Sequence, residues 1–530
     1  MRTETMKQHW AIRATGWTWR VILVLTIGIL LLCQGWEYAN KVTLPWGNAL
    51  CLLVGAAGGV LLLGLAWVIT RHSQNPGRRK ALMGVLCLAL SFGIFYVSAH
   101  YAHTGGWDPA VVYQDAIAIG QGFTEDVNNW YFGMYANNVF LTIVFSWIFS
   151  LGEPLGLLNR EYFILHAIQS LGYGWVLWMT YLSAEKLNGD EKPWLSLWSW
   201  MLALLLIGIS PWVAVQYTDS AALILGATQI WVFLRCREEK RRPLWLGVFG
   251  LLSAIAYKIK PQTLILVIAA VLMTLLGEPE KWFRKEALKR ALTSALAFGV
   301  CMGIGLGAVK IIVDRSPYDL NPEAQMGITH YLKMGLNPET MGGYNAEDMG
   351  ESAVIGSSAE RSRADWETAM ERARAMGPGG LLAHAVRKTM TNYSDGTFGW
   401  EQEGDFYAYD TYFFEGSSPW FYEHIPPFYI GADYPDMVDG SFSHVWRTIV
   451  QCAWLAVLLF GAFSFSKTSD HRVAVLQLAI LGLTLFQLLF EARARYLFAY
   501  APAYILLAGT GLGNLTAWIR KRWGKEPAEA

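Results

Sequence analysis

Long apolar stretches recur along the chain and are separated by polar turns. A helix needs about 20 mostly apolar residues to cross a bilayer. Twelve stretches reach or approach that length: 20–36, 46–70, 81–101, 162–183, 195–213, 220–235, 244–256, 262–277, 291–313, 446–464, 473–490 and 496–516. A further apolar run at 139–151 is shorter. The pattern therefore predicts an α-helical polytopic membrane protein, with a bundle of about 12 transmembrane helices.

The basic residues predict how the spans are oriented, because cytoplasmic loops carry an excess of Lys and Arg. If 139–151 crossed the membrane, the basic cluster at 235–242 would face the same side as Asp108. If 139–151 is instead an interfacial or re-entrant helix on the outer side, every basic cluster falls inside: 2–20, 71–80, 186–192, 235–242, 281–290, 467–472 and 520–522. We therefore predict a multi-pass protein of the cytoplasmic membrane with both termini in the cytoplasm.

This orientation divides the chain into four parts. Residues 1–80 form a cytoplasmic tail and two extra spans, and 81–313 form a transmembrane core with a first outer loop at 102–161. Residues 314–445 form a large extracytoplasmic loop domain, and 446–530 hold the last spans and a cytoplasmic tail. The N-terminus is basic and lacks a small-residue cleavage site, so we expect a retained first span.

The extracytoplasmic segment has its own helical signals. It carries 21 acidic and 8 basic residues. Helical spacing predicts a helix at 360–376, which GPGG at 377–380 ends, and an amphipathic helix at 381–393. The aromatic loop that follows is read either as a platform for sugars or as packing of a small domain onto the membrane.

Composition narrows the function classes. The chain is 54% hydrophobic and 16% charged, and its net charge is zero, so no overall field favours nucleic acid. The 6 cysteines lie in or beside apolar runs with no CxxC spacing. We therefore expect neither a disulfide framework nor a zinc site.

Acidic residues stand near the outer ends of spans. Asp108 and Asp219 are the carboxylates nearest to span ends, where apolar surroundings can raise a pKa into the range of a general base. Asp115 follows Asp108 by seven residues, so a helix there would place both on one face. An ordinary solvated outer loop is the alternative interpretation.

Basic residues on the predicted outer side suit a phosphate. Lys258 and Lys260 precede Pro261, and Glu491, Arg493 and Arg495 form a second turn in which one Arg can pair with Glu491. Ammonium and guanidinium groups at membrane depth fit a lipid phosphate. Snorkelling of Lys and Arg towards water is the alternative.

Seven motifs, in this order, carry a family resemblance: WYFGMYANN (130–138), YTDS (217–220), AYKIKP (256–261), HYLKMGLN (330–337), GGYN (342–345), NYSDGTFGWE (392–401) and EARARYLFAYAP (491–502). Over residues 81–516 the chain resembles the bacterial membrane glycosyltransferases of the GT-C superfamily, most of all the enzymes related to protein O-mannosyltransferases and lipid A aminoarabinose transferases. It lacks the Asp-Glu pair that several members have at the position of Asp108.

The resemblance implies a GT-C-like bundle with outer juxtamembrane helices, which agrees with the place predicted for 139–151. It also implies a catalytic Asp at Asp108, a second acidic residue at Asp219, and a polyprenyl-phosphate sugar donor. Lys260 and Arg493 or Arg495 would contact the donor phosphate.

Together these observations predict an inverting glycosyltransferase that moves a sugar from a polyprenyl-phosphate carrier to a glycan, lipid or protein acceptor of the cell envelope, outside the cytoplasmic membrane. Asp108 is the expected base, Asp219 orients the acceptor or supports the base, and Lys258, Lys260, Arg493 and Arg495 hold the phosphate. We expect no metal. Further candidates for substrate binding are Asp115, Tyr217, His330, Trp400, Glu401, Tyr409 and Glu491. The alternatives are a lipid-linked sugar flippase or other transporter, an O-antigen-type polymerase or ligase, and a non-catalytic scaffold.

Overall fold

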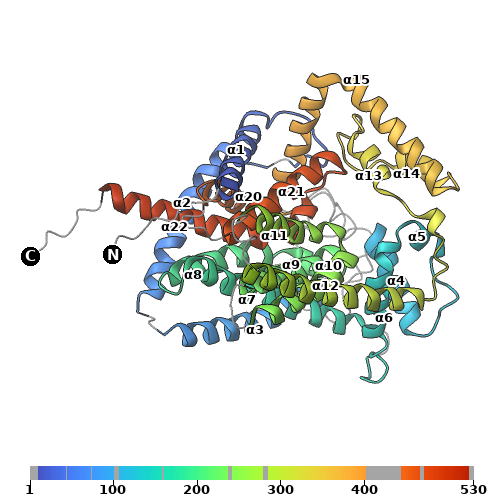
Figure 1. The fold of residues 1–530 in the computed structure, drawn as a ribbon, viewed down its shortest axis with the longest axis horizontal. Coiled ribbons are helices and arrows are strands. Elements are labelled where there is room, and N and C mark those ends of the chain that lie inside the picture. Colours follow the sequence, from blue (N-terminus) through green and yellow to red (C-terminus); the bar gives the residue numbers. More distant parts are fainter. Residues whose placement is uncertain are drawn as a thin grey trace, which may run out of the picture.

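The described part of the chain consists of helices and turns, with no strand (Figure 1). The computed structural model describes residues 10–42, 44–72, 75–100, 107–157, 160–236, 241–277, 285–400, 443–465 and 471–523. The predicted α-helical class is therefore confirmed over these residues.

A helix lies at each of the twelve predicted spans: α1 (Trp10–Leu32), α2 (Asn48–Thr70), α3 (Pro76–His100), α7 (Tyr162–Asn188), α8 (Pro193–Ala203), α9 (Thr218–Arg235), α10 (Arg242–Ile259), α11 (Leu264–Gly277), α12 (Lys285–Asp314), α20 (Ser443–Gly461), α21 (Arg472–Leu489) and α22 (Ala501–Trp523). By length and composition, 7 helices among the described residues can cross a membrane: α1, α2, α3, α12, α20, α21 and α22. That all twelve cross stays a prediction.

The apolar run at 139–151, which is predicted to be interfacial, forms a short helix. In chain order it stands between two long antiparallel helices, α3 and α7. Lys80 of α3 pairs with Glu185 of α7 at one end, and the rings of Phe95 and Phe163 lie 6.4 Å apart at the other. Helix α7 therefore begins at the end where α3 finishes. Between them lie α4 (Trp107–Gly120), α5 (Asn129–Met134) and α6 (Val139–Phe149). Eleven residues of helix span only about 16 Å, so α6 does not run the length of the bundle.

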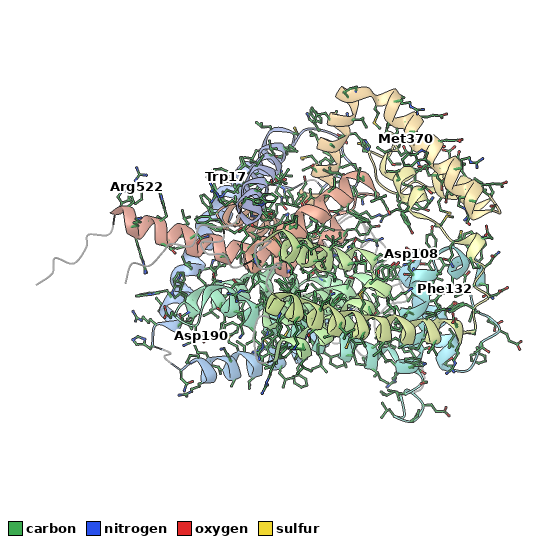
Figure 2. The ribbon with its side chains drawn as sticks, viewed as in Figure 1. Trp17, Asp108, Phe132, Asp190, Met370 and Arg522 are labelled. Carbon is green, nitrogen blue, oxygen red and sulfur yellow. The ribbon has the colours of Figure 1, made fainter. Side chains whose placement is uncertain are left out.

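The two ends of the bundle differ in charge. At one end, which we call the basic end, Lys80 of α3 pairs with Asp190 after α7, and Arg472 at the start of α21 donates to the carbonyl of Lys186. Figure 2 shows Asp190 and Arg522 towards this end, and Asp108 and Met370 towards the opposite one, which we call the acidic end. Which of the two ends faces the cytoplasm stays a prediction.

In the predicted outer segment, the described residues 315–400 form three α-helices at the acidic end: α13 (Ile328–Gly335), α14 (Ala346–Ala353) and α15 (Ser358–Tyr393). The predicted helices at 360–376 and 381–393 are both present, and the chain leaves the helical conformation between them inside the GPGG motif, as predicted. Only Gly377 leaves the helical conformation, with φ 60° and ψ 178°. Glycine tolerates this φ, and Pro378 can begin the next helix because a first-turn N–H needs no partner.

Buried ion pairs hold the three outer helices together. Lys333 of α13 lies 3.3 Å from Asp365 of α15, and Arg372 of α15 donates to both carboxylate oxygens of Asp348 of α14. Charged residues of the predicted helix at 360–376 therefore join it to its neighbours.

Candidate active site

Asp108 lies in the first turn of α4 and contacts the turn before α9. Its Oδ2 accepts a hydrogen bond from the Tyr217 hydroxyl at 3.3 Å. Asn138 donates to both Tyr217 and Tyr131, at 3.3 Å and 2.6 Å. A carboxylate in the first turn of a helix is favoured by the helix dipole. The predicted base is thus half-buried and held at the acidic end by residues of the motifs WYFGMYANN and YTDS.

Asp219 and Lys260 form a buried ion pair. Asp219 lies in the first turn of α9, and Lys260 directly follows α10. Lys260 Nζ contacts Asp219 Oδ1, and the two residues are 8% and 2% exposed, respectively. The ammonium also lies 4.9 Å from the centre of the Tyr496 ring. Asp219 Oδ2 is buried with no hydrogen-bond partner among the described residues. The structure therefore joins the predicted second acid directly to the predicted phosphate ligand.

Glu491 and Arg493 form a second ion pair at the same end. Arg493 Nε donates to Glu491 Oε1 at 2.6 Å, and the Tyr496 hydroxyl donates to Oε2 at 2.9 Å. Burial would raise the pKa of Glu491, but the guanidinium groups of Arg493 and Arg495 bring it below its usual value. Glu491 is therefore an ionised partner of these cations.

Backbone contacts bring the outer motifs together. Gln262, after AYKIKP, donates to the carbonyl of Tyr496, and the N–H of Ala492 donates to the carbonyl of Gly342 in GGYN. The Arg493 guanidinium lies 5.6 Å from the centre of the Tyr344 ring. The Arg495 guanidinium lies over Tyr496 and acts electrostatically on Tyr217. Three carboxylates and three cations thus gather near one another: Asp108, Asp219, Glu491, Lys260, Arg493 and Arg495.

A polar network fixes the turn that carries Tyr217. Ser98 Oγ and Gln216 Nε2 lie 2.5 Å and 3.0 Å from the Nδ1 of buried His166. Gln169 of α7 donates to the carbonyls of Val213 and Val215, which satisfies backbone groups inside the bundle. The network therefore sets the position of Tyr217 relative to α3 and α7.

Asp115 has a structural environment. It shares α4 with Asp108, as predicted, but its Oδ2 accepts hydrogen bonds from the N–H of Asn128 and the hydroxyl of Tyr318. Burial raises the pKa of Asp115, and these two hydrogen bonds oppose the rise. Asp115 thus ties α4 to the loop after it and to the start of the outer segment.

Two predicted ligands point elsewhere. Lys258 is exposed in the last turn of α10, and its ammonium lies 5.8 Å from the centre of the Tyr257 ring. Lys260 follows α10 with an extended backbone (φ −146°, ψ 106°) and is buried, whereas Lys258 is exposed on the helix, so the structure gives the two ammonium groups different surroundings. His330 is buried in the outer segment, where its Nδ1 lies 3.0 Å from Ser352 Oγ.

Trp400, Glu401 and Tyr409 are predicted to contact the sugar, and of these the structure describes only Trp400, which is buried. Trp400 is 3% exposed, and its ring packs edge-on against Trp212 at 5.4 Å. Trp212 in turn donates to the carbonyls of Thr397 and Phe398. Glu401 and Tyr409 lie outside the described residues.

Sequence reasoning missed the tyrosines around Asp108. The charge of Asp108 acts on Tyr135, Tyr331 and Tyr344, and Tyr131 lies against Tyr135 with ring centres 5.1 Å apart. These residues stand inside the motifs WYFGMYANN, HYLKMGLN and GGYN. Their recurrence in separate outer motifs was the available signal.

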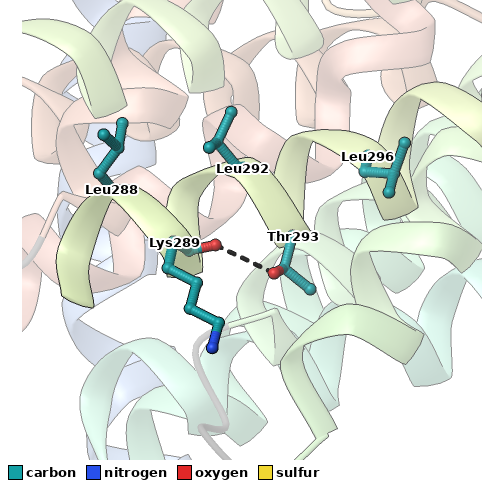
Figure 3. A pocket seen from close by; sticks show the side chains of 5 residues that line it. All are labelled: Leu288, Lys289, Leu292, Thr293 and Leu296. Atoms are coloured by element: carbon teal, nitrogen blue, oxygen red, sulfur yellow. Dashed lines mark hydrogen bonds between the residues drawn. The ribbon is translucent and has the colours of Figure 1, made fainter. Parts of the chain in front are cut away.

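A shallow hollow lies on α12, away from this cluster. It is lined by Leu288, Lys289, Leu292, Thr293 and Leu296 (Figure 3). The Thr293 hydroxyl donates to the carbonyl of Lys289 in its own helix. The hollow belongs to the first half of α12, whereas Asp314 at the other end of that helix leads towards Tyr318 and Asp115.

Lys388 connects the outer segment to the Glu491 turn. Its Nζ donates to the carbonyls of Gly335 and Phe490 at 2.7 Å and 2.6 Å. Burial lowers the pKa of Lys388 to about 7, against the attraction of Glu491.

The thermal stability of the protein is therefore expected to rise with pH between about pH 7 and pH 10. In that window an unfolded Lys, with a pKa near 10.4, binds a proton that folded Lys388 does not, so alkaline conditions favour the folded state. Thermal unfolding across this range should show a larger rise for wild type than for Lys388→Met. An equal rise in Lys388→Met would contradict the assignment, and Arg387→Met is the matched control.

The fold and the site define an α-helical integral membrane protein whose turns gather a polar cluster at one end of the helices. The model of a family described as conserved hypothetical integral membrane protein matches residues 65–514. The chain therefore belongs to this family. No curated protein matches the chain. The family match runs from within α2 to within α22, so it covers the site and the outer segment.

Proposed function

We propose that the protein is an inverting glycosyltransferase that uses a polyprenyl-phosphate-linked sugar at the outer face of the cytoplasmic membrane. The observation that carries the proposal is the gathering of Asp108 and the cations of Lys260, Arg493 and Arg495 at the acidic end. A base and a set of cations that hold a departing phosphate are the minimum for this reaction. The resemblance of the outer motifs to GT-C enzymes supports the same reaction class.

In the proposed reaction, Asp108 takes the proton of an acceptor hydroxyl as its oxygen attacks the anomeric carbon. The bond from that carbon to the phosphate oxygen breaks on the opposite side, which inverts the configuration. Polyprenyl phosphate leaves with the electron pair of that bond. Lys260, Arg493 and Arg495 stabilise its added negative charge, and Tyr217 keeps Asp108 oriented.

The two ion pairs give Asp219 and Glu491 a role in this proposal. They hold Lys260 and Arg493 in place when no donor is bound, so a donor phosphate competes with carboxylates that are already present. Asp219 Oδ2 has unused capacity to accept a hydrogen bond, which suits the predicted role of Asp219 in orienting the acceptor.

The tyrosines around Asp108 replace Trp400 as the proposed border of the sugar. Aromatic faces pack on apolar sugar surfaces, and tyrosine hydroxyls can bond the sugar edges. Tyr135, Tyr331 and Tyr344 come from three motifs, and the charge of Asp108 acts on each of them. Trp400 is instead packed against Trp212 inside the bundle.

The test is sugar transfer by full-length protein in lipid nanodiscs. Synthetic polyprenyl-phosphate sugars, labelled on the sugar, are offered with envelope glycans, lipids or proteins as acceptors, and release of polyprenyl phosphate is measured. We expect stoichiometric transfer from a monophosphate-linked donor. Transfer only from diphosphate-linked glycans would favour the polymerase or ligase. Movement of donor between the leaflets of proteoliposomes without transfer would favour the flippase, and no donor binding would favour the scaffold.

A further inference from the structure

Arginine side chains stack on tryptophan rings where helices reach the basic end of the bundle. The Arg71 guanidinium lies 5.6 Å from the centre of the Trp67 ring at the end of α2. The Arg522 guanidinium lies 5.4 Å from the centre of the Trp518 ring at the end of α22. In each pair the tryptophan precedes the arginine by one helical turn, so both side chains lie on one face. The stacking holds one face of the guanidinium on an indole and leaves its N–H edge for another acceptor.

The same pairing occurs on α1 and α9. The Arg20 guanidinium lies 5.3 Å from the centre of the Trp17 ring, and the Arg235 guanidinium lies 5.6 Å from the centre of the Trp231 ring. Figure 2 shows Trp17 on the side of the molecule away from Asp108. We call these the stacked pairs: Trp17–Arg20, Trp67–Arg71, Trp231–Arg235 and Trp518–Arg522.

The last stacked pair stands on a part of α22 that leaves the bundle. Helix α22 is buried through Asn514, which donates to the carbonyl of Phe465 after α20, and it is exposed from Trp518 onwards. Figure 1 shows α22 extending past the neighbouring helices on this side. Trp518 and Trp523 are 50% and 69% exposed, with ring centres 5.9 Å apart. Two large aromatic rings therefore stand without cover from the described part of the chain.

The surface around the stacked pairs is basic as well as aromatic. Trp17 and Trp67 are 63% and 47% exposed, so their rings face the surroundings of the bundle. The exposed end of α22 carries Arg520 and Lys521 beside Arg522, and α22 contains no acidic residue. Tryptophan rings collect at the level of lipid headgroups, and each Lys or Arg near an anionic membrane adds attraction. Charge and aromatic character therefore both fit an anionic lipid surface.

We propose that the stacked pairs form a binding surface for the phosphate groups of anionic phospholipids, with the exposed end of α22 as its most accessible part. The guanidinium edges donate to phosphate oxygens, while the indoles lie between headgroups and acyl chains. Helices α1, α2 and α22, which carry three of the four pairs, are candidate membrane spans, so lipid headgroups are the anions nearest to them. The proposal is independent of sugar transfer and of which end faces the cytoplasm.

The test compares two lipids with the same acyl chains on the full-length protein in a neutral detergent. Fluorescent phosphatidylglycerol and phosphatidylcholine are titrated separately, and binding is followed by anisotropy. Wild type should bind phosphatidylglycerol more tightly, and added salt should reduce the difference. Arg71→Gln/Arg522→Gln should lose about fivefold in phosphatidylglycerol affinity for each arginine removed, with its phosphatidylcholine affinity unchanged. Arg315→Gln/Arg363→Gln is the matched control and should bind as wild type does, because both of these arginines are exposed at the acidic end.

Trp518→Leu separates stacking from charge. It keeps an apolar side chain and every cation of α22 but removes the ring beneath Arg522, so phosphatidylglycerol affinity should fall while phosphatidylcholine affinity stays. Thermal unfolding in phosphatidylcholine should be unchanged in every variant, which shows that these losses are not losses of the fold.

Equal affinity of wild type for the two lipids would overturn the proposal, and so would an equal loss in Arg315→Gln/Arg363→Gln. Displacement of phosphatidylglycerol by millimolar inorganic phosphate would overturn it in favour of a free anion. A wild-type dimer that Trp518→Leu dissociates would assign the exposed end of α22 to a second copy of the chain instead.

Discussion

Asp108→Asn should lower the rate of sugar transfer by a factor of about 10²–10⁴, the usual contribution of a general base. Asparagine keeps the size of the side chain and an oxygen that can accept from the Tyr217 hydroxyl. It cannot take up the acceptor proton. Donor binding should therefore persist, and single-turnover transfer measured beside equilibrium donor binding separates the two effects.

Asp115→Asn is the matched control, because Asp115 lies on the same helix and is bound to Asn128 and Tyr318. Its transfer rate should stay close to that of wild type. An equal loss in both variants would mean that the integrity of α4, and not a base, limits the rate. Full activity in Asp108→Asn would remove Asp108 from the proposed reaction.

Lys260→Met should weaken donor binding about tenfold to a hundredfold, since a hydrogen bond to a charged group contributes about 1.5–3 kcal/mol. It should also destabilise the protein by about 3–5 kcal/mol, because Asp219 would be left buried without its partner charge. Lys258→Met should change neither quantity, since Lys258 is exposed in the last turn of α10. Donor titration and thermal unfolding measure the two effects.

The double variant Lys260→Met/Asp219→Asn separates stability from binding. Removing the lone carboxylate charge should restore most of the lost stability, while donor binding should stay weak. Recovery of donor binding together with stability would show that Lys260 acts only through the fold. If Lys258→Met weakened donor binding and Lys260→Met did not, Lys258 and not Lys260 would hold the donor phosphate.

Hydropathy located the helices well, because apolar runs of sufficient length have one favourable arrangement in lipid. It was weaker for helices that carry buried polar groups. Helix α7 contains His166 and Gln169, whose partners lie on other helices, and it is long yet falls outside the candidate spans by composition. The GPGG motif was predicted correctly, since Gly377 takes a φ of 60° that glycine tolerates and thereby separates the two helices.

The candidate site was partly predictable. The outer motifs were recognised because each combines charged or aromatic residues with the end of an apolar run. Their pairing was not, because Asp219 and Lys260 are 41 positions apart and nothing in their local patterns says that α9 and α10 meet there. The different roles of Lys258 and Lys260 depend on where α10 ends, which a sequence window does not resolve to one residue.

The sequence by itself determined the class of the protein, the positions of its helices and the grouping of its basic turns, since these follow from the local free energy of placing apolar and charged groups in a membrane. The tertiary structure decided which charges neutralise each other and which residues hold Asp108 and Lys260. Such contacts join residues far apart in the chain. They depend on how neighbouring helices pack and rotate, and packing is a property of the whole bundle and not of any one segment.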